Sequence, residues 1–135
     1  MTRGRLALSL LVALVVCLGL GFAWGSSGRG VLETALEDSR QQLDLAEARG
    51  ALLDARVSLY NNNFGDASRR LEDAKAPLRK VKARYQDAGR SQSASSIDAA
   101  LTHVDEAQRL AVRLDPSANT RAGEALEAIK VGTQR

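Results

Sequence analysis

The basic residues Arg79, Lys80, Lys82 and Arg84 form the one dense cluster of positive charge in this chain. Four cations within six residues attract phosphate groups, whether these belong to a nucleic acid or to lipid head groups. The same pattern is also typical of a solvated helix face that pairs with acidic side chains of a neighbouring helix. The second interpretation is the simpler one. Choosing between the two requires the helices that surround the cluster.

Residues that perform catalysis or hold metals are nearly absent. The chain has one histidine, His103, one cysteine, Cys17, and one methionine, Met1. A metal or haem site needs several ligands at fixed spacing, and no glycine-rich phosphate loop or nucleophile elbow occurs. His103 lies off the apolar face of its predicted helix, so we expect it to be solvated. The sequence therefore predicts no catalytic residue, no metal, no cofactor and no enzyme activity.

The segment from Tyr60 to Ala74, YNNNFGDASRRLEDA, is the other candidate for a binding site. Its three consecutive asparagines either expose their amides in a binding loop or form the turn between two helices. Asparagine tolerates left-handed backbone angles, and Asn63 or Asp66 can cap the start of a helix. We therefore interpret this segment as a turn between helices.

An uncharged apolar run, LALSLLVALVVCLGLGFAW, extends from Leu6 to Trp24. As a helix it would be about 28 Å long, close to the hydrocarbon thickness of a bilayer. Arg3 and Arg5 precede the run and acidic residues follow it, which by the positive-inside rule keeps the short N-terminal end in the cytoplasm. Residues 1–25 are thus predicted to be a single-pass anchor in the cytoplasmic (inner) membrane, with the remaining domain outside, in the periplasm.

Cleavage of the same segment as a secretory signal is the alternative. Ala23 and Gly25 place small residues at −3 and −1 of a cut after Gly25, and the glycines near the end of the run favour this outcome. The length of the apolar run favours a retained anchor instead. Cys17 lies mid-segment without small residues before it, which argues against a lipoprotein. Cleavage would release a secreted or periplasmic protein.

Beyond a flexible linker at residues 26–30, the pattern is helical throughout. No stretch alternates with the period of two that marks a β-strand, whereas apolar residues recur at helical spacing. We predict an all-α exported domain over residues 31–135, a long antiparallel helical hairpin followed by a shorter one. The expected helices lie at about 31–61, 64–88, 95–114 and 117–131.

Two apolar stripes predict how the first hairpin packs. The first stripe has a strict 4-3 spacing and comprises Leu32, Leu36, Ser39, Leu43, Ala46, Gly50, Leu53, Val57 and Tyr60. The second stripe comprises Phe64, Ala67, Leu71, Ala74, Leu78, Val81, Tyr85 and Ala88. Each persists for about four heptads, which is typical of a helix–helix seam.

Paired residues of this hairpin are expected to have numbers that sum to 124. Tyr60 then faces Phe64, Leu53 contacts Leu71, and Gly50 meets Ala74, where two small residues let the backbones approach closely. In the same register two ion pairs, Asp54 with Arg70 and Asp44 with Lys80, flank the seam.

The second helix contains one interruption and one end signal. Pro77 removes a backbone donor inside the helix and predicts a kink, because the apolar stripe continues past it without a change of phase. Gly89 is expected to end the helix as its C-cap glycine.

Two segments resemble tetratricopeptide (TPR-like) helical hairpins. In YNNNFGDASRRLEDA an aromatic residue ends one helix, and Ala55, Ala67 and Ala74 match small packing positions of that motif. The segment LAVRLDPSANTRA, from Leu110, resembles the junction between two repeats, with Pro116 at the terminal proline. The resemblance covers roughly residues 48–80 and 100–130. It implies a helical surface that binds proteins.

Two classes of function follow from these patterns. The first is a membrane-anchored envelope protein, held by residues 6–24, whose helical interaction or scaffold domain binds an unidentified protein partner or a second copy of itself. The second is a cleaved, freely exported helical-bundle protein that holds a ligand between its hairpins. Export argues against nucleic acid as the ligand of the basic cluster, which leaves an anionic membrane surface as the other partner that Arg79, Lys80, Lys82 and Arg84 could bind.

Overall fold

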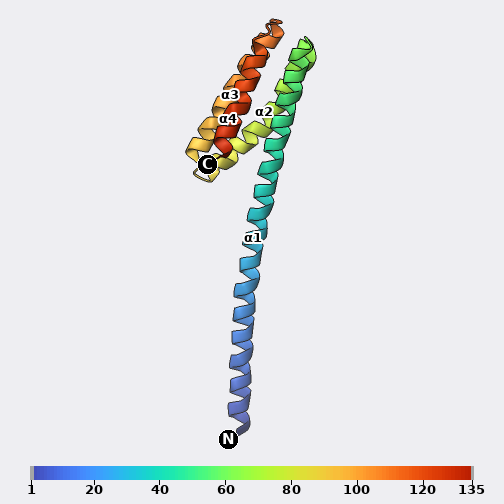
Figure 1. Ribbon diagram of the computed structural model, residues 1–135. Helices are drawn as coiled ribbons and strands as arrows, with labels where there is room; N and C mark the ends of the chain where they lie inside the picture. Colours follow the sequence, from blue (N-terminus) through green and yellow to red (C-terminus); the bar gives the residue numbers. More distant parts are fainter. Residues whose placement is uncertain (1, 135) are drawn as a thin grey trace. The chain divides into compact units, whose positions relative to one another are not determined.

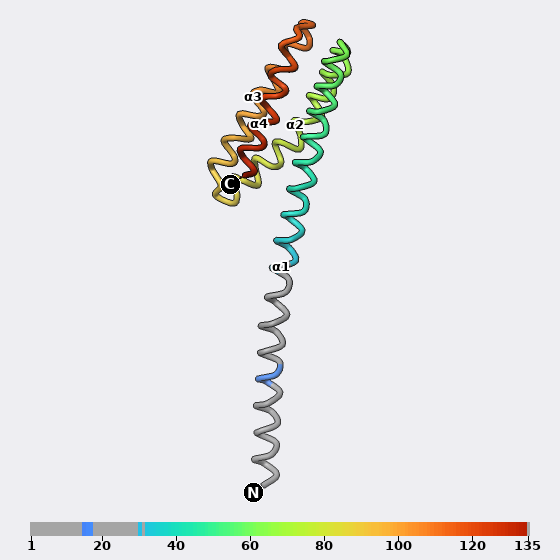
Figure 2. The backbone as a smooth tube through the Cα atoms, viewed as in Figure 1, coloured from blue at the N-terminus to red at the C-terminus, as the bar shows by residue number. Residues whose placement is uncertain are grey.

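The computed structural model describes the backbone of residues 2–134 and the side chains of residues 15–17, 30 and 32–134. Figure 2 draws in grey the residues whose placement is uncertain. Its elements are four helices: α1 (Thr2–Tyr60), α2 (Phe64–Asp87), α3 (Ser91–Val112) and α4 (Ala118–Thr133) (Figure 1). The predicted all-α class is confirmed. The chain divides into two compact units, residues 1–39 and 40–135. The fold below is that of the second unit, to which α1 contributes its residues from Arg40 onward.

The predicted membrane segment lies mostly outside the described residues. Of residues 6–24, the structure describes the side chains of Val15, Val16 and Cys17 only. Within the described part of the chain, no helix is both long enough and apolar enough to cross a bilayer. Residues 26–30, predicted to be a flexible linker, fall within the bounds of α1.

The C-terminal ends of α1, α2 and α3 are closed by the same hydrogen-bonded turn. After α2, Gly89 has φ +69°, and the amides of Gly89 and Arg90 donate to the carbonyls of Gln86 and Tyr85. This pattern is a Schellman motif, and it confirms Gly89 as the residue that ends α2. Asn62 (φ 57°) and Leu114 (φ 58°) occupy the equivalent left-handed positions after α1 and α3. α2 itself continues through Pro77 without a break.

The four helical segments of this unit run alternately up and down. Along each pair of neighbouring helices, successive ion pairs join increasing residue numbers on one helix to decreasing residue numbers on the other, so the two helices are antiparallel. These pairs are Asp44–Lys80 (3.7 Å) and Asp54–Arg70 (4.0 Å) between α1 and α2, Lys75–Asp105 (2.7 Å) and Lys82–Asp98 (2.5 Å) between α2 and α3, and Arg121–Glu106 (3.2 Å) between α3 and α4. His103 also lies 3.3 Å from Glu124 between α3 and α4.

Contacts between α4 and α1 close the arrangement. Arg56 donates to Asn119 at 2.8 Å, and Arg49 donates to Thr133 at 3.0 Å. The result is two antiparallel hairpins, α1–α2 and α3–α4, that share one core (Figure 1). The predicted pair of hairpins is therefore present. α3 begins at Ser91, about one turn before the expected start at residue 95.

Alanines make up more than half of the buried apolar residues of this core. Small side chains allow helix axes to approach closely, and the larger residues fill the spaces between them. The largest fully buried side chains come from all four helices and are Tyr85, Leu52, Leu71, Leu78, Ile97, Ile129, Val81 and Val104.

The stripe predicted to be the core face of α2 is confirmed from Ala67 to Tyr85, whereas Ala88 at its end is exposed. The stripe predicted for α1 is wrong. On α1, Leu53 is 52% exposed and Tyr60 is 81% exposed, whereas Leu52 is completely buried. A side chain added at Gly50 would meet nothing within 4 Å, so the expected close approach of Gly50 to Ala74 does not occur. The buried residues of α1 are Leu45, Ala48, Leu52, Ala55 and Leu59, together with Asp44.

The error concerns rotation about the axis of α1 and not the register along it. Both flanking ion pairs expected from the constant sum of 124, Asp54–Arg70 and Asp44–Lys80, are present. The two apolar stripes of α1 are centred about 150° apart at 100° per residue, so they occupy nearly opposite faces. α1 buries the stripe that contains Ala48 and Ala55 and leaves the other in solvent.

Replacing two adjacent leucines tests which face of α1 is the core. Leu52→Ala should lower the free energy of unfolding by about 2–5 kcal/mol, because it leaves a cavity in a packed interior. Leu53→Ala should change it by less than about 0.5 kcal/mol in the monomeric chain, since Leu53 is exposed. Denaturant unfolding at low protein concentration measures both values. Equal losses for the two variants would contradict this orientation of α1.

Candidate functional site

The basic cluster on α2 lies between two acidic residues of the same chain. Lys80 and Arg84 both contact the carboxylate of Asp44 on α1, with Lys80 Nζ 3.7 Å from Asp44 Oδ1. Lys82 Nζ lies 2.5 Å from Asp98 Oδ1 on α3. Asp44 is only 8% exposed. These cations therefore join α2 to both of its neighbours.

Arg79 differs from the other three cations of the cluster. It is exposed on α2 and has no ion pair within the described residues. It lines a shallow groove between α2 and α3 together with Lys82, Asp98 and Asp105. Because two carboxylates share that groove, its charge is mixed. Binding of an anionic surface by Arg79, Lys80, Lys82 and Arg84 stays a prediction, and the contacts favour the alternative of a helix face paired with acidic neighbours.

A second group of charges, around Lys75, was not predicted from the sequence. Lys75 is 8% exposed, and its ammonium lies 2.9 Å from Glu72 and 2.7 Å from Asp105, and donates to Gln108. Burial alone would lower the pKa of Lys75, but hydrogen bonds to Asp105 and Glu72 outweigh it and raise the pKa. The sequence feature that indicates the burial of Lys75 is its position four residues after Leu71, which places it on the apolar side of the helix. The group joins α2 to α3. Glu72, Asp105 and Gln108 together use the three N–H groups of the Lys75 ammonium.

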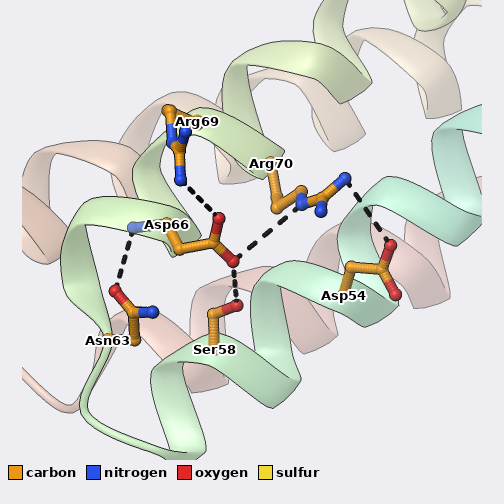
Figure 3. Close-up of polar contacts among 6 residues, drawn as sticks. All are labelled: Asp54, Ser58, Asn63, Asp66, Arg69 and Arg70. Carbon is orange, nitrogen blue, oxygen red and sulfur yellow. Dashed lines mark hydrogen bonds and ion pairs between the residues drawn. The ribbon is translucent and has the colours of Figure 1, made fainter.

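The asparagine-rich segment is a turn, as predicted, and the side chains of Asn63 and Asp66 bond to other groups of the chain (Figure 3). Asn63 Oδ1 accepts from the Asp66 amide at 3.2 Å and so caps α2. Ser58 donates to Asp66 Oδ2 at 2.7 Å, and Arg69 Nη2 lies 2.8 Å from Asp66 Oδ1. The Ser58 hydrogen bond is the main cause that holds the pKa of Asp66 below its usual 3.8, with Arg70 and Arg69 assisting. Asn63 and Asp66 are therefore occupied by the turn itself.

His103 is half-buried, which differs from the solvated position expected of it. Its Nδ1 atom lies 3.3 Å from Glu124 Oε2 on α4. Arg121 connects the same carboxylate to Glu106 on α3, at 2.7 Å and 3.2 Å. In the described part of the chain no three His, Cys, Asp or Glu residues are placed to hold one metal ion. These residues tie α3 to α4.

The exposed stripe of α1 remains as the candidate site. We name as the outer stripe the α1 residues with strict 4-3 spacing, from Leu32 to Tyr60, which do not face the core. Its large apolar members are all more than half exposed: Leu32 66%, Leu36 53%, Leu43 69%, Leu53 52%, Val57 61% and Tyr60 81%. The other exposed large apolar residues between residues 61 and 134 are few, namely Val112 on α3, Leu114 between α3 and α4, and Val131 on α4. A row of exposed apolar side chains along a helix is typical of a binding site for another protein.

Comparison with known proteins identifies no relative. No family model matches the chain, and neither a curated protein nor a solved structure is significantly similar to it. The function must therefore be inferred from the residues of the chain.

Ser58→Ala tests the polar contacts of the turn. Since the pKa of Asp66 is depressed in the folded state, its contribution to stability is present above the unfolded pKa and is lost as pH falls through the folded one. Removing the hydroxyl should raise the pKa of Asp66 toward 3.8 and reduce the stability lost between neutral pH and pH 3. NMR titration of the Asp66 carboxyl and unfolding at several pH values measure this. An unchanged titration would contradict it. Ser95→Ala, at an exposed serine of α3, is the control.

Asp44→Asn tests whether the basic cluster serves the fold. The amide keeps the size of the side chain but removes the charge that faces Lys80 and Arg84. The expected loss of unfolding free energy is about 1–3 kcal/mol, between the values for exposed and buried ion pairs. Asp38→Asn, at an exposed position of the same helix, should change little. Equal effects of the two substitutions would show that the pairing with α2 contributes nothing to stability.

Proposed function

We propose that this chain is a membrane-anchored envelope protein whose helical domain, outside the cytoplasm, binds a protein through the outer stripe of α1. The exposure of that stripe carries the proposal. The second face of α1 holds five exposed leucine, valine and tyrosine residues within residues 36–60. Leaving this apolar face in water is energetically unfavourable. A partner that covers this face would remove its apolar surface from water, which favours binding.

The contacts of the other candidates support a binding role over a catalytic one. Asp66, Lys75 and Asp44 each interact with partners in their own chain. Helical hairpins of the tetratricopeptide type, which residues 48–80 and 100–130 resemble, bind proteins through such helical surfaces. The proposal therefore assigns this chain an interaction or scaffold role.

The anchor in this proposal rests on sequence. Leu6 to Trp24 form an uncharged apolar run with Arg3 and Arg5 before it. A tethered domain would present the outer stripe at a membrane surface. Cleavage near Gly25 would instead release the same domain, and the stripe would then serve a freely exported binding protein.

Membrane extraction separates the two forms. The full-length chain should remain in the membrane fraction after carbonate washing, and its intact mass should include residues 1–25. Deletion of residues 6–24 should move it to the washed supernatant. A mature chain that begins near Ser26 and is released without detergent would contradict the anchor and support the exported alternative.

A further inference from the structure

We propose that the outer stripe of α1 is the seam of a parallel two-stranded coiled coil with a second copy of this chain. This inference rests on the proposed binding role of the stripe and names the partner. The stripe keeps its 4-3 spacing from Leu32 to Tyr60, four heptads or about 43 Å of helix. A heptad stripe complements itself, because in a parallel pair every residue at positions a and d meets its own copy.

The spacing assigns a heptad position to each residue of the stripe. A step of three residues leads from a to d, and a step of four leads from d to the next a. Leu36, Leu43, Gly50 and Val57 are therefore a residues. The d residues are Leu32, Ser39, Ala46, Leu53 and Tyr60.

Charges beside the seam favour a parallel, in-register pair. In that arrangement each g residue faces the e residue five positions later on the other helix. Arg49 at g then faces Asp54 at e, and Gln42 faces Glu47, while no pair of like charges is brought together. Asp54 is accessible for this role, since its side chain is 62% exposed and lies 4.0 Å from Arg70.

The bundle leaves this seam free on both sides. Arg49 and Arg56, at g positions, reach toward α4 through Thr133 and Asn119. Asp54, at an e position, reaches toward α2 through Arg70. α2 and α4 therefore flank α1 on the side of the core, and the a and d residues point away from both. Arg49 uses one of its five N–H groups on Thr133 and retains others for a partner.

Gly50 gives an independent reason for a close neighbour. Glycine within a helix costs about 1 kcal/mol relative to alanine. Nothing in the described part of the chain requires it, because an added Cβ would meet no atom within 4 Å. Next to Ala46 along the seam, it leaves room for the backbone of a second α1 to approach.

Cysteine cross-linking of the full-length chain in its membrane tests the proposal. The native thiol is first removed with Cys17→Ser, and Ser39→Cys and Ala46→Cys, both at d positions, are then introduced one at a time. Copper phenanthroline should link each variant to its own copy as a disulfide dimer, visible on a non-reducing gel. Ala76→Cys, at an exposed alanine of α2, is the matched control and should stay monomeric.

Both cross-links together are specific for parallel chains in register. An antiparallel pair can bring only one of the two positions close to its own copy, so a dimer from a single variant would overturn the parallel arrangement. Absence of a dimer from both variants, or equal cross-linking of Ala76→Cys, would overturn the seam itself.

Charged substitutions give the second measurement. Leu43→Glu with Leu53→Glu, added to the Ala46→Cys chain, should reduce its dimer at least about tenfold, since they place carboxylates in an apolar seam. The matched pair Val112→Glu and Val131→Glu, at exposed valines of α3 and α4, should leave it unchanged. Unaltered helical circular dichroism in both double variants would show that the fold is intact. Persistence of the dimer in the leucine variant would overturn the proposal.

Carbonate extraction of the same samples keeps the two proposals separate. A chain that resists extraction but forms no disulfide dimer retains its anchor and lacks the seam. A chain that forms the dimer but is extracted has the seam and lacks the anchor.

Discussion

The fold depends on one constraint, which is that α1 has two apolar faces and the bundle can bury only one. It buries the face with Ala48 and Ala55 between larger leucines. Alanine lets α1 lie close to its neighbours, where longer side chains would hold the helices apart. The orientation of α1 then decides which acidic residues meet α2. Asp44 lies at the edge of the buried face, and this places its carboxylate against Lys80 and Arg84.

Polar contacts set the position of α1 along α2, independently of this rotation. The turn holds Ser58, Asn63 and Asp66 together at one end of the hairpin, and Asp44 meets Arg84 toward the other. Every such pair has nearly the same sum of residue numbers, so the charges and the turn agree on one register. A slip of α1 along α2 by one residue would break the contacts at both ends of the hairpin.

Because register and rotation of α1 are set by different interactions, the sequence predicts the first and not the second. The helical class, the turn, Gly89 and the register follow from local patterns and from paired charges. The buried face of α2 was predictable because its opposite face is charged, with residues such as Arg69 and Asp73. On α1 two stripes compete, and periodicity alone does not reveal which one meets the bundle. The burial of Lys75 was not predicted because it depends on Asp105 and Gln108, which belong to a different helix.

The lengths of the two stripes of α1 also differ. Continued toward the N-terminus at the same spacing, the buried stripe reaches Gln41 and Asp38 just before Leu45 and so becomes polar. Its apolar part is therefore limited to the residues that α2 and α4 cover. The outer stripe continues to Leu36 and Leu32, both exposed. Because the outer stripe extends further toward the N-terminus than the buried stripe, it is not an extension of the core. Its period of 3.5 residues is that of a coiled-coil seam, and the proposed pairing with a second copy of the chain would cover it.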